Sequence, residues 1–372
     1  MKSPNSIRKV PCATLIIGTV SVAAFMLFLI RSDTAIDYMK KGLKLCSATV
    51  IPSLFPFMVI SELIVSSDVG RLLGKLFSKP AELLFGVSEN CACALALGTV
   101  CGFPIGAKTL CLMYDRGEIS KKELERAMTF CNNPGSAFVI SAVGISLFED
   151  RRVGMILYLS VIASSVIIGI FARIIFGKIT PSSRASTKFE NGSDDSIRIF
   201  VNAIKSSAFA MLTVCALVTF FSSFVGCLGS ILSGIGNSAI AVIFSFFELS
   251  SGVGMSAELE NINQAIITCA AALGWSGLSV HLQIASICAG RDISLKPYLV
   301  AKLFQSVLCA ILTGVALKIF PISKGGYRDA FFHINGSICS NATFLCAIFF
   351  LAAILPLILN RKTVDKQKKA PR

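Results

Sequence analysis

Apolar stretches of about twenty residues recur along this chain and alternate with short polar or charged segments. A helix of about twenty apolar residues is long enough to cross the hydrocarbon core of a bilayer. The pattern therefore predicts an all-α polytopic membrane protein with about eight transmembrane helices. The predicted crossings cover residues 10–30, 45–65, 127–148, 154–176, 203–224, 262–289, 297–320 and 343–359.

Two further apolar segments, at residues 90–114 and 231–254, are interrupted near their middle by glycine and polar residues. Each arm of the first is only about ten residues long, which is too short to cross a bilayer alone. Basic residues flank this first segment on both sides, and the positive-inside rule puts both flanks in the cytoplasm. We therefore expect two re-entrant hairpins. Unwound backbone at such depth is tolerated only inside protein or against a watery cavity.

Two of the predicted crossings are also broken, one at residues 132–136 and the other at residues 274–277. Each half of the chain then contains a crossing, a hairpin, a broken crossing and an uninterrupted crossing, in that order. Because each half contains three true crossings, an odd number, the two halves enter the membrane in opposite directions, which makes an inverted repeat. The predicted divisions are an N-terminal helix and connector (1–40), a first gate-like repeat (41–176), a cytoplasmic linker (177–197), a second gate-like repeat (198–320), and a C-terminal helix with a basic tail (321–372).

Composition agrees with a membrane protein, because 54% of the 372 residues are hydrophobic and only 15% are charged. The formal net charge of +14 does not indicate nucleic-acid binding, since the basic residues lie in loops, in the linker and in both tails. Between residues 227 and 290 there is no lysine or arginine, which is typical of a segment facing outward. Both termini are then cytoplasmic. Residues 68–84 form either an amphipathic helix in the cytoplasmic interface, which the pattern favours, or an ordinary solvated connector.

No candidate chemistry for an enzyme or a metal site emerges from the sequence. Most of the 14 cysteines lie in apolar spans, where they act as small hydrophobic residues. Neither His281 nor His333 has another potential metal ligand at a spacing typical of metal sites. No nucleophilic residue can be matched to a catalytic base either. We expect neither enzyme activity, nor a cofactor, nor a bound metal.

The motif at residues 102–108, the break at residues 132–135 and the hairpin with Glu248 and Gly252 together resemble the nucleoside-recognition gate domain proteins. More closely, residues 41–320 resemble the sporulation integral membrane proteins of that family. The resemblance implies a fold similar to concentrative nucleoside transporters, with paired hairpins forming the substrate site. It also implies transport of dipicolinic acid (pyridine-2,6-dicarboxylate) in the cell membrane or outer forespore membrane of a spore-forming bacterium. Ile105 departs from the small polar residue usual in the family.

Dipicolinate carries two carboxylates, and helix N-termini bind anions. One carboxylate could meet the backbone N–H groups near Gly102 and Gly106. Lys108 either pairs with the substrate or reaches the interface with its charged end. The polar residues of the first break, at 132, 133 and 136, either bind the second carboxylate or satisfy their own unwound backbone.

Glu248 would repel a dianion, so it carries a proton, binds a coupling cation or pairs with Lys108. Trp275 either stacks on an aromatic substrate or anchors the protein at the interface. The expected partners are a small anionic substrate, the bilayer and a coupling proton or cation. The sequence is also compatible with a homo-oligomer. The alternatives are a nucleoside or other organic-anion transporter on the same scaffold, and a non-transporting membrane scaffold of the spore envelope. The expected substrate-binding residues are Gly102, Phe103, Pro104, Gly106, Lys108, Asn132, Asn133, Ser136, Glu248, Ser250, Ser251, Gly252, Trp275 and Ser276.

Overall fold

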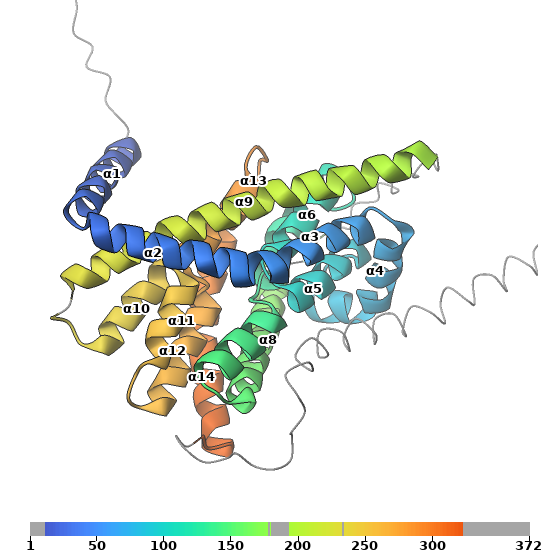
Figure 1. The fold of residues 1–372 in the computed structure, drawn as a ribbon. Coiled ribbons are helices and arrows are strands. Elements are labelled where there is room, and N and C mark those ends of the chain that lie inside the picture. Colours follow the sequence, from blue (N-terminus) through green and yellow to red (C-terminus); the bar gives the residue numbers. More distant parts are fainter. Residues whose placement is uncertain (1–11, 178, 180–192, 233, 323–372) are drawn as a thin grey trace, which may run out of the picture.

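The computed structural model describes residues 12–177, 179, 193–232 and 234–322, and within these ranges it is all-helical (Figure 1). The first half contains α1 (Cys12–Ile30), α2 (Ser32–Leu45), η1 (Cys46–Val50), α3 (Ile51–Val65), α4 (Asp68–Pro80), η2 (Ala81–Phe85), α5 (Glu89–Cys101), α6 (Ile105–Asp115), α7 (Lys121–Cys131), η3 (Ala137–Leu147) and α8 (Arg151–Phe176). The second half contains α9 (Ser193–Ile231), α10 (Asn237–Phe247), α11 (Leu249–Ala257), α12 (Ile262–Trp275), α13 (Gly277–Cys288) and α14 (Lys296–Ile319). The elements labelled η are π-helical.

The predicted all-α membrane fold is confirmed, although the count of about eight crossings is not. Among the described residues, five helical segments are long and apolar enough to cross a membrane. The count becomes six if α5 and the helix before it, which meet at a 95° bend, form one span. The predicted crossing at residues 343–359 lies outside the described residues. The five segments are Ser32–Val65, Arg151–Phe176, Ile197–Ile231, Ile262–Cys288 and Lys296–Ile319.

Helix pairs stand where the two hairpins were expected. Helices α5 and α6 pack against each other and are joined by a short turn with a positive φ at Gly102 and a cis Phe103–Pro104 bond. Helices α10 and α11 likewise pack together and turn at Glu248. The breaks are shorter than the motifs indicated, because Gly106 and Lys108 already belong to α6. The depth of the turns in a bilayer remains a prediction.

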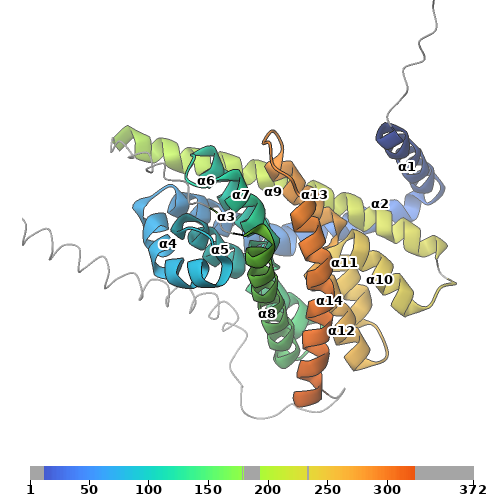
Figure 2. The same cartoon turned by 180° about the vertical axis from the view of Figure 1, so that it is seen from behind.

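The long helices of the two halves pack together in two groups. Helices α8, α12 and α14 contact one another, while α9 runs along α2 and α3 and crosses this group steeply (Figures 1 and 2). Small residues allow close approach between the helices of the first group. A Cβ on Gly274 of α12 would lie 2.7 Å from the Cα of Ser306 on α14. The predicted crossing at residues 127–148 is not among the five segments, since it is divided into α7 and the short apolar η3. The repeated order of elements in the two halves, the division into domains and the inverted orientation therefore remain predictions.

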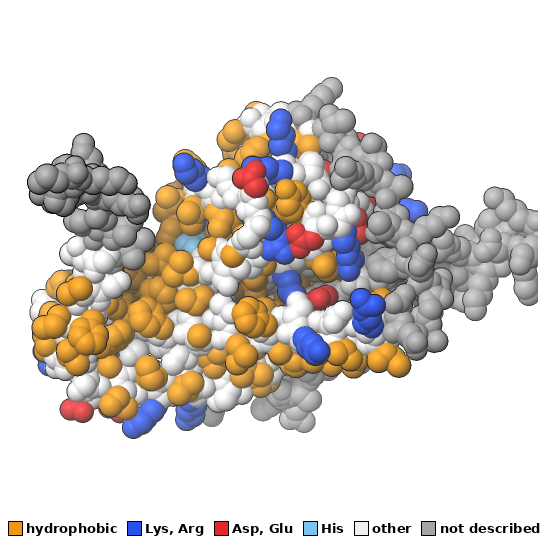
Figure 3. All heavy atoms as spheres, turned by 90° about the horizontal axis from the view of Figure 1, so that it is seen from above, with side chains coloured by type: hydrophobic (Ala, Val, Ile, Leu, Met, Phe, Trp, Pro, Cys, Tyr) orange, Lys and Arg blue, Asp and Glu red, His pale blue; other side chains and the backbone are white. Residues whose placement is uncertain are grey.

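Two loops that were both predicted to be cytoplasmic meet at one end of the molecule. Arg291 pairs with Asp115 at 2.5 Å, and Lys121 pairs with Asp292 at 3.0 Å. Seen from above in Figure 3, charged side chains gather on part of this face and hydrophobic side chains cover its left and lower parts. The loops therefore lie on the same side, as the charge pattern predicted.

The segment at residues 68–84 is amphipathic, as expected. In α4 the side chain of Leu73 is buried, while the basic residues at positions 71, 75 and 79 are exposed. Its placement in a membrane interface remains a prediction.

Candidate functional site

The two hairpin turns and the two broken crossings surround one partly open space of about 90 Å³, which we call the central cavity. Each of the two hairpin turns and each of the two broken crossings contributes to its wall. The wall residues from these four segments include Cys101, Phe103, Pro134, Gly135, Glu248, Leu249, Ser250, Ser279, Val280 and Gln283.

The turn of the first hairpin rests on the first broken crossing. The backbone N–H of Phe103 donates to the carbonyl of Asn133 at 2.8 Å. A Cβ on Gly106 would lie 2.5 Å from the carbonyl oxygen of Cys131, so only glycine fits there without displacement. The N–H of Ile105 donates to the carbonyl of Gly102. The N–H groups of residues 103 and 105 thus have hydrogen-bond partners inside the protein. Binding of a substrate carboxylate near Gly102 and Gly106 stays a prediction.

The turn of the second hairpin carries its own anion. The two carboxylate oxygens of Glu248 accept hydrogen bonds from the backbone N–H groups of Ser250, at 3.0 Å, and Ser251, at 2.6 Å. The carboxylate therefore caps α11 and fills the anion site that a helix N-terminus offers. Gly277, with φ of 80°, lies against Glu248 and Leu249, so the second break supports this turn as the first break supports the first turn.

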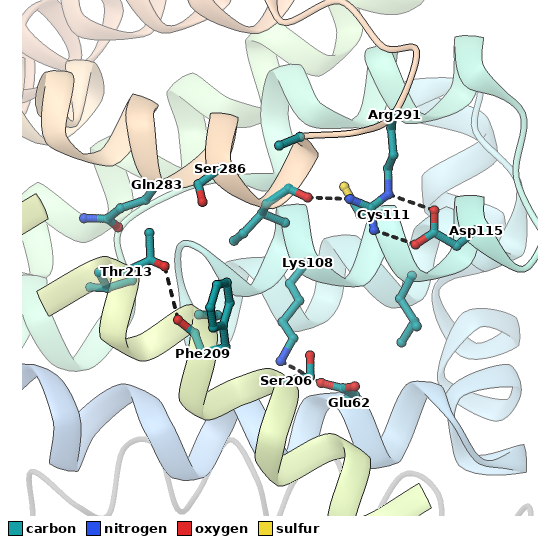
Figure 4. Close-up of a pocket in the computed structure, with 15 residues that line it drawn as sticks. Glu62, Lys108, Cys111, Asp115, Ser206, Phe209, Thr213, Gln283, Ser286 and Arg291 are labelled. Carbon is teal, nitrogen blue, oxygen red and sulfur yellow. Dashed lines mark hydrogen bonds and ion pairs between the residues drawn. The ribbon is translucent and has the colours of Figure 1, made fainter. Parts of the chain in front are cut away.

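Lys108 lies beside a wider space of about 390 Å³, the charged cavity, between α3, α6, α9 and α13 (Figure 4). Its ammonium lies 2.6 Å from the Glu62 carboxylate and donates to the Ser207 hydroxyl at 2.8 Å. The predicted alternative in which Lys108 pairs with Glu248 is therefore wrong in this structure, because each group has other partners. Arg291, paired with Asp115, lines the same cavity. In this loop the hydrogen bond to Asp115 raises the pKa of Arg291.

The polar side chains at the break of the first broken crossing form most of their hydrogen bonds with other groups of the protein. Asn132 donates to the Met128 carbonyl at 3.3 Å, while its side-chain oxygen is buried and has no hydrogen-bond partner. Ser136 lies 3.4 Å from the carbonyl of Val100. For Ser136, this geometry favours the reading in which the side chain satisfies unwound backbone.

Trp275 lies apart from the cavity wall. Its indole N–H donates to the carbonyl of Phe246 at 3.0 Å, and its ring stacks on the Phe246 ring at 5.6 Å. Trp275 thus packs on the second hairpin. Its two expected roles, stacking on a substrate and anchoring at the interface, stay predictions. Ser276 is buried with a φ of 79°, and its hydroxyl lies 3.3 Å from the Leu273 carbonyl. A Cβ on Gly252 would collide with Ser245, so Gly252 serves the close packing of α11 against α10.

The structure adds residues that the sequence reading missed. Glu62 is the partner of Lys108, and Ser279 presents a buried hydroxyl with no hydrogen-bond partner in the wall of the central cavity. Lys302 and Gln305 are fully buried in α14 and interact with Asn133. A sequence pattern that could have identified Lys302 and Gln305 is their spacing of i and i+3 inside an apolar crossing. Polar residues at such spacing share one helix face, which is expected to face the protein interior.

The central cavity lies between the charged cavity and a third one. Val214 and Gln283 line both the charged and the central cavity. The third space, of about 460 Å³ and lined by Glu258 near the opposite end, is called the distal cavity. The central and distal cavities share four wall residues, namely Leu45, Thr49, Phe138 and Ser250. The three spaces therefore adjoin through shared wall residues, and the central one, whose wall contains both hairpin turns, has the smallest volume of the three.

No protein-family model matches the chain. Among curated proteins it is similar to the sporulation integral membrane protein YlbJ of Bacillus subtilis (strain 168), with 27% identity over 370 residues covering 88% of this chain and 90% of YlbJ. Among solved structures it is similar to CNTnw in an inward-facing substrate-bound state, with a TM-score of 0.41, 14% identity, and coverage of 84% of this chain and 88% of CNTnw. The similarity to YlbJ confirms the resemblance to sporulation integral membrane proteins that the motifs indicated.

Proposed function

We propose that this protein is a membrane carrier that moves dipicolinate across a forespore membrane during sporulation. The observation that carries the proposal is the set of three adjoining cavities, the smallest of which lies between two hairpin turns and two broken crossings. Transporters place their substrate sites at such breaks, where unwound backbone lines a cavity. The similarity to YlbJ, a sporulation integral membrane protein by name, supports the cellular setting.

The charged cavity suits the entry of an organic anion. At about 390 Å³ it lies within the size range of small-molecule sites, and Lys108 and Arg291 are in its wall. Each cation is held by a carboxylate of the protein. A dicarboxylate can take over these contacts by displacing Glu62 from Lys108 or Asp115 from Arg291, so that the cations remain paired throughout.

The central cavity is too narrow for the substrate as it stands. Its volume of about 90 Å³ is well below the roughly 300 Å³ at which small-molecule sites begin. Passage of dipicolinate therefore requires the hairpin turns to separate from the broken crossings. The unpartnered hydroxyl of Ser279 would then donate to a carboxylate of the passing substrate.

Uptake of labelled dipicolinate into liposomes containing the purified protein tests the proposal. We expect uptake in the unsubstituted protein and at least a tenfold loss in Lys108→Ala. Lys121→Ala is the matched control, since it removes a lysine from an exposed ion pair at the same end. No uptake under any gradient by folded, inserted protein would contradict the carrier function. Equal uptake by Lys108→Ala would preserve the carrier and remove Lys108 from its site.

One observation supports the alternative of nucleoside transport: among the described residues, none in the wall of the central cavity is basic. A neutral substrate would rely on Asn133 and Glu248 rather than on Lys108. Labelled uridine in the same liposomes distinguishes the two, because nucleoside uptake should survive Lys108→Ala and fail in Glu248→Gln. Failure of both substrates would favour a non-transporting scaffold of the spore envelope.

A further inference from the structure

Lys302 is a buried cation in the middle of the helix group formed by α7, α8, α12 and α14. Its side chain is 1% exposed. The ammonium donates to the side-chain oxygen of Gln305 at 2.8 Å and lies 3.5 Å from that of Asn133. Both oxygens are neutral, and Lys302 has no carboxylate partner among the described residues.

The charged groups on the helices around Lys302 have other partners. On α7, Glu123 accepts hydrogen bonds from the backbone N–H groups of Ser88 and Ser120, and Glu125 accepts from that of Ser294. The buried Arg126 of α7 donates to the backbone carbonyls of Phe85 and Gly86. Helix α12 has no acidic or basic residue, and the arginines of α8 lie at its ends and are exposed.

Burying an ammonium without an anion costs several kcal/mol, and a lysine can avoid that cost by releasing its proton. Tyr298 OH lies one helical turn away on α14 and is 2.9 Å from His281 Nδ1 of α13. The other titratable groups that interact with Lys302 are the thiols of Cys131 on α7 and Cys309 on α14.

Asn133 joins Lys302 to the hairpin turn at the central cavity. Its side-chain oxygen lies 2.7 Å from the amide nitrogen of Gln305, which donates to it, and also faces the Lys302 ammonium. Its backbone carbonyl accepts the hydrogen bond from Phe103 in the turn. One residue of the unwound segment thus touches both the buried lysine and the part that must move for substrate to pass.

We propose that Lys302 is the proton-binding site of this protein and that its protonation state controls the first hairpin through Asn133. The coupling role rests on the proposed transport function, whereas reversible protonation of Lys302 does not. In the protonated state the ammonium holds Gln305 and Asn133 in the arrangement seen here. When water reaches the site from one side, one N–H bond breaks, the proton passes to water and a neutral amine remains. The contact with Asn133 then weakens and Phe103 can separate from the break.

Trp275 provides a reporter of this site that needs no substrate. It is the only tryptophan of the chain, and its ring centroid is 4.3 Å from that of His281, whose partner Tyr298 lies one turn from Lys302. We would record its emission in lipid nanodiscs from about pH 5 to about pH 10. The expected result is one transition in the unsubstituted protein that persists in His281→Gln and disappears in Lys302→Met. Lys302→Arg stays charged and should also lack the transition.

Several outcomes would overturn the protonation site. These are no transition in the unsubstituted protein, a transition that persists in Lys302→Met, or one that disappears in His281→Gln and so belongs to the histidine. If Lys302→Met does not fold, Lys302→Gln, which keeps a donor for Asn133, serves in its place. If neither folds, Lys302→Arg decides, because a transition retained in that variant contradicts the assignment.

Dipicolinate uptake driven by a pH gradient tests the coupling separately. We expect acceleration by the gradient in the unsubstituted protein and none in Lys302→Arg. A fluorescence transition together with gradient-insensitive uptake would refute the coupling and keep the protonation site. A transition without any uptake would refute the proposed carrier function instead.

Discussion

At the scale of single residues, the first hairpin approaches the broken crossing as closely as its glycines allow. Gly106 faces the carbonyl of Cys131 and the side chain of Asn132. Close backbone approach of this kind has no room for a Cβ, so the glycines of the motif serve packing. The contribution of close packing to stability can be separated from that of helix propensity by comparison with Gly254. This glycine lies in helix α11, and a Cβ added to it would have no atom within 4 Å.

Gly106→Ala should lower the free energy of unfolding by about 1–3 kcal/mol, the usual cost of overpacking a tight contact. The reason is that the new methyl group would lie 2.5 Å from the Cys131 carbonyl oxygen. Gly254→Ala, the control, should be neutral or stabilising by up to about 1 kcal/mol, since alanine favours a helix. Thermal unfolding of the purified variants in the same detergent measures both. A stable Gly106→Ala protein would mean that α6 and α7 lie further apart than they do here.

Glu248→Ala should destabilise the protein by about 1 kcal/mol or more through loss of the cap on α11, and Glu248→Gln by less. Gln keeps one of the two acceptor oxygens that bind the N–H groups of Ser250 and Ser251 but loses the charge that favours a helix N-terminus. Glu260→Gln, at an exposed position nearby, is the control. Thermal melting of the three variants gives the order. Equal melting temperatures for Glu248→Ala and the control would contradict the capping role.

At the scale of elements, the positions of the breaks could be predicted where glycine, proline or paired amides cluster, because a cluster of such residues disfavours a helix. A single one does not, since Pro56 lies inside α3 and Gly106 inside α6. Which groups then pair across helices could not be predicted. Glu62 lies in a predicted crossing with no nearby cation in sequence, and only the packing of α3 beside α6 brings it to Lys108. The role of Lys302 could not be predicted for a similar reason, since one lysine hardly alters the hydropathy of a long apolar span.

A disulfide between Cys111 of α6 and Cys288 of α13 tests the packing of the first half against the second. Their sulfur atoms lie 3.7 Å apart, and a small movement brings them to the roughly 2 Å of an S–S bond. Mild oxidation should therefore form an intramolecular disulfide, seen as a linked peptide pair by mass spectrometry. Cys111→Ser and Cys288→Ser should each abolish it. If the charged cavity widens between these helices during transport, the disulfide should also stop uptake until it is reduced. If the unsubstituted protein fails to form the disulfide, α6 and α13 lie further apart than they do in this structure.

At the scale of the whole molecule, charge and cavities give the same axis. The ion pairs of the loops after α6 and α13 mark one end, beside the charged cavity, and the distal cavity, whose wall contains both Lys41 and Glu258, lies near the other. The grouping of these loops could be predicted because positive residues follow a rule of membrane insertion that needs no packing detail. The series of cavities could not be predicted, since it arises from side chains of both halves that meet only in the folded protein.

Accessibility from the two sides of the membrane checks this axis. Ser206→Cys places a thiol in the charged cavity and Met255→Cys places one in the distal cavity. By the positive-inside rule the charged cavity opens to the cytoplasm, so an impermeant thiol reagent should label Ser206→Cys in inside-out vesicles and Met255→Cys in intact spheroplasts. The unsubstituted protein gives the background from native cysteines, most of which are buried where the structure describes them. Labelling of both positions from one side would show that the three cavities do not cross the membrane. Because the carrier proposal requires them to cross, that result would remove its structural basis even if the fold were correct.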